Sequence, residues 1–179
     1  MRSCFILLLL SASLFATSPS LAQGQERSDE QYVRDRVARL VEQTATGQAR
    51  VTAHDSLIVL HAEAHEVDPD WLRAIIMAEA TRLPEDIGDR VAPTGIDAVE
   101  WVGLDDATVE SFSDPSENIR LAALLLRRIL DRLPEGNQSL RVVASLYDDI
   151  ATNSVTPYGM LVEQAYSKRW WEPEDGAGR

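Results

Sequence analysis

Cysteine is almost absent from this 179-residue chain, in which Cys4 is the only one. Everything after Cys4 therefore lacks both disulfides and thiolate chemistry and must be held together by packing. Basic residues are also scarce, with 17 Lys and Arg against 29 Asp and Glu, which gives a net charge of −12. Such a surface repels nucleic acid and anionic lipid, so we expect a protein that binds neither. Glycine-rich phosphate loops, a nucleophile elbow and a basic, aromatic-rich face are missing as well.

Long hydrophobic runs are missing except at the N-terminus, where the apolar stretch from Cys4 to Leu10 follows the basic Arg2. This stretch is too short to be a good membrane span, and small residues stand at Ser20 and Ala22. The layout predicts a secretory signal peptide over residues 1–22, cleaved after Ala22, and hence a periplasmic protein with no membrane segment after cleavage. A retained membrane anchor is the alternative interpretation.

The remaining chain favours a single all-α domain of about six helices with one long irregular region. Residues 23–50 form an N-terminal helix region, residues 51–171 the main domain, and residues 172–179 a disordered tail. Apolar periodicity predicts a helix over 29–44, ended by Gly47, and a second over 52–65. Cap and proline patterns predict further helices that begin near Pro69, Pro115, Ser139 and Pro157. Between residues 85 and 112 the periodicity disappears apart from a short helix near 105–111, and a loop of this length usually has a functional reason.

Glu79 interrupts an apolar stripe. In "VDPDWLRAIIMAEATR" the residues Leu72, Ile75 and Ile76 lie on one helical face, and the next position on that face is Glu79. Burial of a carboxyl group raises its pKa, and a carboxylic acid that is still protonated near neutral pH can act as a general acid. The structural alternative is a glutamate at the edge of the stripe that reaches solvent or pairs with Arg73 or Arg82.

The three histidines, His54, His61 and His65, share one helical face. Imidazoles four residues apart can bind one zinc ion, so a zinc-binding helical protein that uses His61 and His65 is a distant alternative. One straight helix cannot bring all three onto a single ion, which favours hydrogen-bonded histidines and no metal or other cofactor. Trp170 and Trp171 could stack on sugar rings, but anchoring of the last helix is the commoner role of a terminal pair.

Several segments together resemble the soluble lytic transglycosylase domain of the lysozyme-like superfamily. "LIVLHAEAHEVDPDWLRAIIMAEA" is similar to its first helix pair, with Glu66 to Pro69 at the turn and Glu79 at the catalytic position. "ENIRLAALLL" offers the Asn118–Ile119 pair that opens the long helix of the family, and "VVASLYDDI" offers its tyrosine as Tyr147. "VTPYGMLVEQAYSKRWW" resembles the closing helix of divergent members. The order holds from about residue 54 to 169.

The resemblance implies an exported enzyme that cleaves the MurNAc–GlcNAc bond of peptidoglycan strands with one glutamate as acid and then base. Glu79 would be that glutamate, and Tyr147 would orient it by a hydrogen bond. Gly95, Ile96 and Tyr158 would bind substrate, and the 85–112 region would line the glycan groove. No second carboxylate is required, in contrast to the usual paired-carboxylate glycosidases.

Three positions depart from the family pattern. Ala80 replaces the serine that follows the catalytic glutamate, Asp148 replaces the asparagine after the tyrosine, and the glutamine expected near Ala98 is missing. These changes, and a net charge opposed to anionic peptidoglycan, keep a second hypothesis open. In it the protein is a catalytically inactive lysozyme-like module that binds glycan or protein within an envelope assembly.

Overall fold

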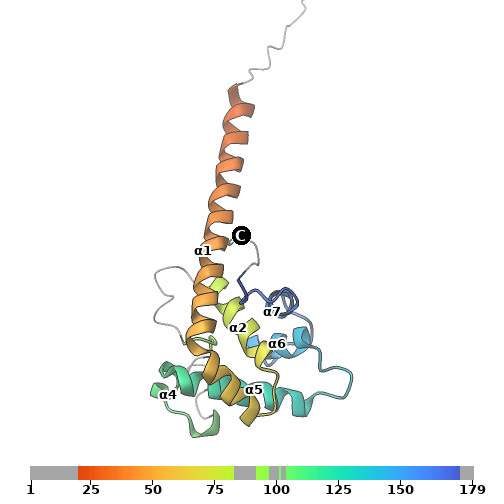
Figure 1. Cartoon of the computed structure of the whole chain (residues 1–179). Coiled ribbons are helices and arrows are strands. Elements are labelled where there is room, and N and C mark those ends of the chain that lie inside the picture. The colour runs from red at the N-terminus through yellow and green to blue at the C-terminus, as the bar shows by residue number, and fades with distance from the viewer. Residues whose placement is uncertain (1–19, 83–91, 97–100, 102–103, 174–179) are drawn as a thin grey trace, which may run out of the picture. The chain divides into compact units, whose positions relative to one another are not determined.

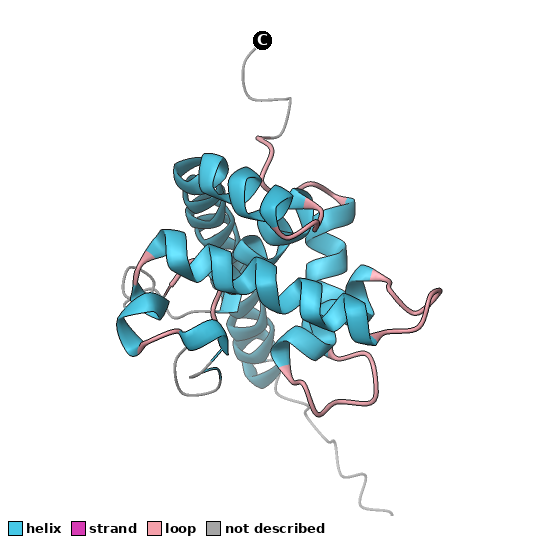
Figure 2. Ribbon diagram, turned by 90° about the horizontal axis from the view of Figure 1, so that it is seen from below, coloured by secondary structure: helices cyan, strands magenta, loops and turns pink. Residues whose placement is uncertain are grey.

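The structure is a computed structural model that describes residues 20–82, 92–96, 101 and 104–173, with side chains from Ala38 onward. The chain divides into two compact units, Met1–Val37 and Ala38–Arg179, and the following description concerns the second. Its described residues are all helical or irregular, without a strand, so the all-α prediction is confirmed for them (Figure 2). The predicted signal peptide lies almost wholly outside the described residues and stays a prediction. No helix among the described residues is both long and apolar enough to cross a membrane.

The first helix, α1, runs without a break over Ser20–Ala64 (Figure 1), so the predicted interruption at Gly47 is wrong. The predicted domain boundary at residues 50 and 51 also falls inside this helix. A glycine weakens a helix but does not have to end it. Here Gly47 allows close packing: a Cβ at this position would lie 2.8 Å from Met77 Sδ and 3.2 Å from Ala80 Cβ. Gly47 therefore marks the contact between α1 and the next helix.

A tight turn separates α1 from the helix that carries Glu79, and that helix begins at Pro69, as its cap pattern predicted. The Val67 amide donates to the Ala62 carbonyl and the Glu66 amide to the Glu63 carbonyl, which together form a Schellman motif. Glu66 adopts φ 53° there, the left-handed conformation that glycine usually supplies at this position. The motif reverses the chain directly before Pro69, where the helix that carries Glu79 begins.

The helices α2, over Pro69–Arg82, and α5, over Pro115–Arg132, form the centre of this unit. Asp114 caps α5 by accepting a hydrogen bond from the Glu117 amide at 2.9 Å. A 3₁₀ turn, η1, covers Leu104–Asp106 and the short α4 covers Val109–Ser113, close to the expected short helix. The helices α6, over Leu140–Asp148, and α7, over Pro157–Ser167, complete the unit.

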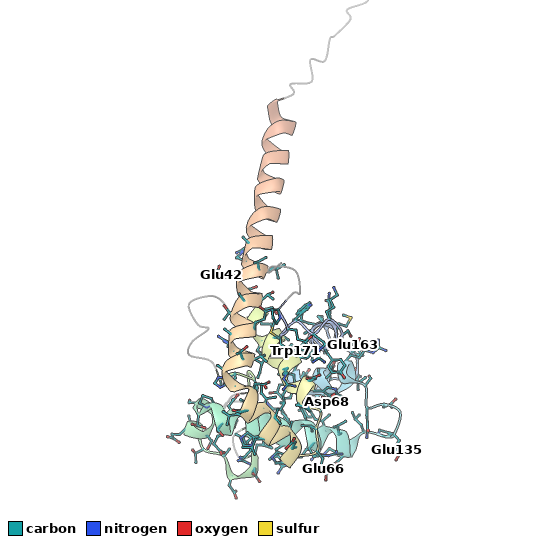
Figure 3. The ribbon with its side chains drawn as sticks, in the orientation of Figure 1. Glu42, Glu66, Asp68, Glu135, Glu163 and Trp171 are labelled. Atoms are coloured by element: carbon teal, nitrogen blue, oxygen red, sulfur yellow. The ribbon has the colours of Figure 1, made fainter. Side chains whose placement is uncertain are left out.

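One hydrophobic core joins these helices. The helix α2 packs against α5 and α7, and α6 packs against the same two (Figure 1). Trp171, labelled in Figure 3, is buried in this core, and Gln48 of α1 donates to the carbonyl of Trp170 at 2.9 Å. The two tryptophans therefore anchor the segment after α7, as expected. The largest fully buried apolar side chains of the core are Ile58, Leu72, Ile75, Ile76, Met77, Ile119, Leu121, Leu126, Val143 and Val162.

Candidate active site

The Glu79 side chain lies on the buried face of α2, as its place in the apolar stripe predicts. Glu79 is 8 % exposed, and its neighbours from Ala74 to Ala80 along the helix are buried as well. Loss of solvation raises the pKa of the carboxyl group and is the largest influence on it. The residue is thus an acid whose protonated form the surroundings favour, with a small part of its surface still open.

A tight turn in the segment between α2 and η1 closes over this carboxyl group. The Gly95 amide donates to the Ala92 carbonyl at 3.1 Å, and Pro93 and glycine occupy the positions that a type I turn prefers for them. Gly95 has φ 71°, and a Cβ there would lie 2.4 Å from Glu79 Cδ and 2.5 Å from Oε2. The glycine therefore meets two requirements at once, a left-handed backbone and direct contact with the carboxyl group.

Asn118 holds this turn in place from the first part of α5. Its side chain, which is fully buried, accepts from the Thr94 amide at 3.1 Å and from the Thr94 hydroxyl at 2.6 Å. Its amide group donates to the carbonyls of Ile96 at 3.0 Å and Phe112 at 3.2 Å. The asparagine side chain therefore uses both its oxygen and its amide group to fix the backbone on either side of Gly95 and to connect it to α4.

Tyr147 of α6 also supports the turn, which corrects the role expected for it. Its side chain is buried in the same interior as Glu79, as predicted, but its hydroxyl donates to the Thr94 carbonyl at 3.0 Å and not to the carboxyl group. Burial, more than any other influence, raises the pKa of this hydroxyl, so it remains a neutral donor. The hydrogen bond of Tyr147 therefore supports the turn that contacts Glu79.

Tyr158 of α7 lies beside the Glu79 carboxyl group. Its hydroxyl oxygen is buried and makes no hydrogen bond of standard geometry with the residues that the structure describes. The contact nevertheless lowers the pKa of Glu79, while burial first and then the nearby Glu79 charge raise the pKa of Tyr158 well above its ordinary value. The structure thus brings Glu79, Gly95 and Tyr158 together, as the resemblance implies.

Arg82, one turn after Glu79 on α2, is the cation of this site. Its Nη1 atom lies 2.7 Å from Asp148 Oδ1 and 3.4 Å from Glu79 Oε1. Its guanidinium also covers the Tyr158 ring, with Cζ 4.7 Å from the ring centroid. Glu79 therefore has a weak ion pair with Arg82, one of the two cations that the structural alternative offered. Arg73, the other expected cation, instead pairs with Asp55 and Asp70.

The histidines lie apart from these residues. His61 Nε2 is 3.1 Å from the Ser116 hydroxyl, and burial is the main cause that lowers the pKa of His54, His61 and His65. Within the described residues no group of three or more His, Cys, Asp or Glu side chains is arranged to hold a metal ion. His61 thus has the hydrogen-bond partner that the satisfied-histidine interpretation requires.

Three features of the site were not recognised from the sequence. Thr94 carries no distinctive pattern beyond the Pro-Thr-Gly order of a turn, and the fixing of that turn by Asn118 requires contacts between distant segments. Asp148 was noticed only as a departure from a family pattern, although it is the closer partner of Arg82. Ile96, which the resemblance assigns to substrate binding, has a buried side chain, and its carbonyl accepts a hydrogen bond from the Asn118 side chain. Of the expected groove lining over residues 85–112, residues 85–91, 97–100 and 102–103 lie outside the described residues.

Comparison with known proteins found no matching family model, no matching curated protein and no matching solved structure.

Proposed function

We propose that this protein is an exported lytic transglycosylase-like enzyme that acts on the glycan strands of peptidoglycan. One observation carries the proposal. A buried glutamate with a raised pKa lies directly against a glycine of left-handed conformation, and hydrogen bonds with the side chains of Asn118 and Tyr147 fix the turn that contains this glycine. The order of the motifs along the sequence supports the same family. A single acid of this kind is the essential group in the mechanism that the resemblance implies.

In this mechanism the protonated Glu79 carboxyl group donates its proton to the oxygen of the MurNAc–GlcNAc bond as the bond from C1 of MurNAc to that oxygen breaks. The resulting carboxylate then removes the proton from the C6 hydroxyl of the same MurNAc, whose oxygen forms a bond to C1. The products are a GlcNAc end with a free hydroxyl and a 1,6-anhydro ring, and Glu79 is protonated again. The residue therefore needs access to both charge states.

The surroundings of Glu79 fit this requirement. Loss of solvation favours the neutral acid, and the charge of Asp148 acts in the same direction, whereas Tyr158 and Arg82 favour the carboxylate. The influences that favour the carboxylate offset part of the rise in the pKa, and a group that acts first as acid and then as base needs surroundings that stabilise both charge states. Arg82 does not fully fix the carboxylate, because it lies closer to Asp148 than to Glu79.

The departure at Ala80 is explained by packing. Ala80 is 5 % exposed and lies against Gly47 of α1, where an added Cβ would be 3.2 Å from Ala80 Cβ. A small apolar residue suits this contact, and a serine hydroxyl there would need a buried partner.

The test is the release of anhydromuropeptides from purified sacculi. We expect the purified protein to release them and Glu79→Gln to be slower by about 10²–10⁴-fold, the usual contribution of a positioned acid. Glu42→Gln, a change at an exposed glutamate of α1 (Figure 3), is the matched control and should retain full activity. Equal release by the wild-type and Glu79→Gln proteins would refute the assignment of Glu79.

A catalytically inactive module that binds glycan or protein in the cell envelope is the second candidate. The observation that favours it is the Arg82 contact, because a cation 3.4 Å from Glu79 Oε1 opposes the protonated form that an acid needs. In this case the wild-type and Glu79→Gln proteins would be equally inert, and both would still sediment with sacculi. Inert protein that stays in the supernatant would point to a protein partner in the envelope.

A further inference from the structure

One nitrogen atom of Arg82 is shared between two carboxyl groups at unequal distances. Nη1 donates to Asp148 Oδ1 at 2.7 Å and, much more weakly, to Glu79 Oε1 at 3.4 Å. The guanidinium lies over the Tyr158 ring, with Cζ 4.7 Å from the ring centroid. The cation is therefore placed to interact with either carboxyl group without a change of helix position.

The two partners differ in their surroundings. The Glu79 side chain is 11 % exposed, whereas that of Asp148 is 25 % exposed and lies at the C-terminal end of α6. Among the described residues, the charged groups that face Glu79 are Arg82 from its own helix and Asp148 from α6, and the neutral hydroxyls of Tyr147 and Tyr158 lie nearby. A negative charge on Glu79 thus attracts the Arg82 guanidinium, for which Asp148 competes.

We propose, on the basis of the function proposed above, that Arg82 and Asp148 are positioning residues that set the charge state of Glu79 during its change from acid to base. Asp148 holds the guanidinium while Glu79 carries its proton, and the guanidinium moves toward Glu79 when that proton passes to the glycosidic oxygen. When the carboxylate takes the proton of the C6 hydroxyl, Arg82 returns to Asp148. The movement needed is about 0.7 Å, the difference between the two distances, which side-chain rotation supplies.

Loss of Arg82 and loss of Asp148 should shift the pKa of Glu79 in opposite directions. Removal of the cation in Arg82→Gln leaves Glu79 with loss of solvation and the Asp148 charge, both of which favour the protonated acid, so the pKa of Glu79 should rise. Removal of the anion in Asp148→Asn frees Arg82 for Glu79 and also removes a repulsive charge, so the pKa should fall. A merely structural ion pair would give loss of stability in both variants and no such opposite shifts.

The experiment is a titration of the protein labelled with ¹³C at the glutamate carboxyl carbons, in which the Glu79 resonance is the one absent from Glu79→Gln. The same variants are assayed on sacculi across pH, where activity is lost as the acid ionises at high pH. We expect Arg82→Gln to move both the titration midpoint and this loss of activity to higher pH, and Asp148→Asn to move both to lower pH. Arg82→Lys keeps the cation and should stay close to the wild type in midpoint, which separates charge from folding defects.

Two controls match the variants. Arg127→Gln removes the cation of a pair between Arg127 and Asp131 of α5, neither of which is among the charged groups that influence Glu79, and Asp149→Asn neutralises the exposed residue next to Asp148. Both should leave the Glu79 midpoint unchanged. Unchanged midpoints in Arg82→Gln and Asp148→Asn, or shifts of the same sign, would overturn the inference. If the midpoints shift in opposite directions but sacculi are not cleaved by the wild type, the charge pair is real and the proposed function is refuted.

Discussion

Replacement of Gly95 by alanine tests the contact on which the candidate site depends. The added methyl group meets two costs. A non-glycine residue in a left-handed conformation such as φ 71° costs about 1–2 kcal/mol. A Cβ 2.4 Å from Glu79 Cδ must also displace that side chain or the turn, and overpacking of this kind costs about 1–3 kcal/mol.

Together these costs predict a loss of roughly 2–5 kcal/mol in the free energy of unfolding. For a chain of this size the corresponding fall in Tm is roughly 4–20 °C. The assay is chemical and thermal denaturation of the wild-type protein and the variant. Gly136→Ala is the matched control, because Gly136 has φ 94° but no atom within 4 Å of an added Cβ, so it bears the backbone cost alone.

A double-mutant cycle with Glu79→Ala isolates the contact. Removal of the Glu79 side chain gives the new methyl group space, so Gly95→Ala should cost about 1–3 kcal/mol less in the Glu79→Ala background. The reasoning is refuted if Gly95→Ala is no more destabilising than Gly136→Ala, or if the two changes at the site are additive.

Two further predictions concern stability. Because the pKa of Glu79 is raised in the folded protein, its protonated form contributes stability that is complete below the pKa of the same residue in the unfolded chain. This stability is lost as the pH rises through the raised pKa of the folded protein. Glu79→Gln, which stays neutral, should therefore gain stability relative to the wild type across that pH window. Denaturant titrations at a series of pH values measure this gain, and a pH-independent difference would contradict it. Asn118→Ala should lower the free energy of unfolding by about 2–4 kcal/mol and reduce activity on sacculi, because it removes the partner of the Thr94 amide and of the Ile96 and Phe112 carbonyls. Asn137→Ala, at an exposed asparagine between α5 and α6, is the control.

Several helix boundaries follow from the sequence because they depend on neighbours within one turn. Asp114 before Pro115 and Thr156 before Pro157 each combine a capping oxygen with a proline that has no amide hydrogen to satisfy, and both helices begin there. These helix starts are local, and residue spacing determines them. The period of its helix also places Glu79 on the apolar stripe, but spacing left open a side chain that reaches solvent from the edge, and only the packed structure buries it.

Tertiary structure decided the rest of the site. The sequence offered both Arg73 and Arg82 as partners of Glu79, and only the tertiary structure brings Asp148, at the end of α6, next to Arg82, at the end of α2. The Tyr147 hydroxyl has a partner on a turn 53 residues away, which no helical period reveals. Gly47 suggested a helix end from its low propensity, but the contact with Met77 made it a point of close packing within α1. Each of these outcomes depends on which distant atoms meet, and chain spacing carries no information about such contacts until the helices pack.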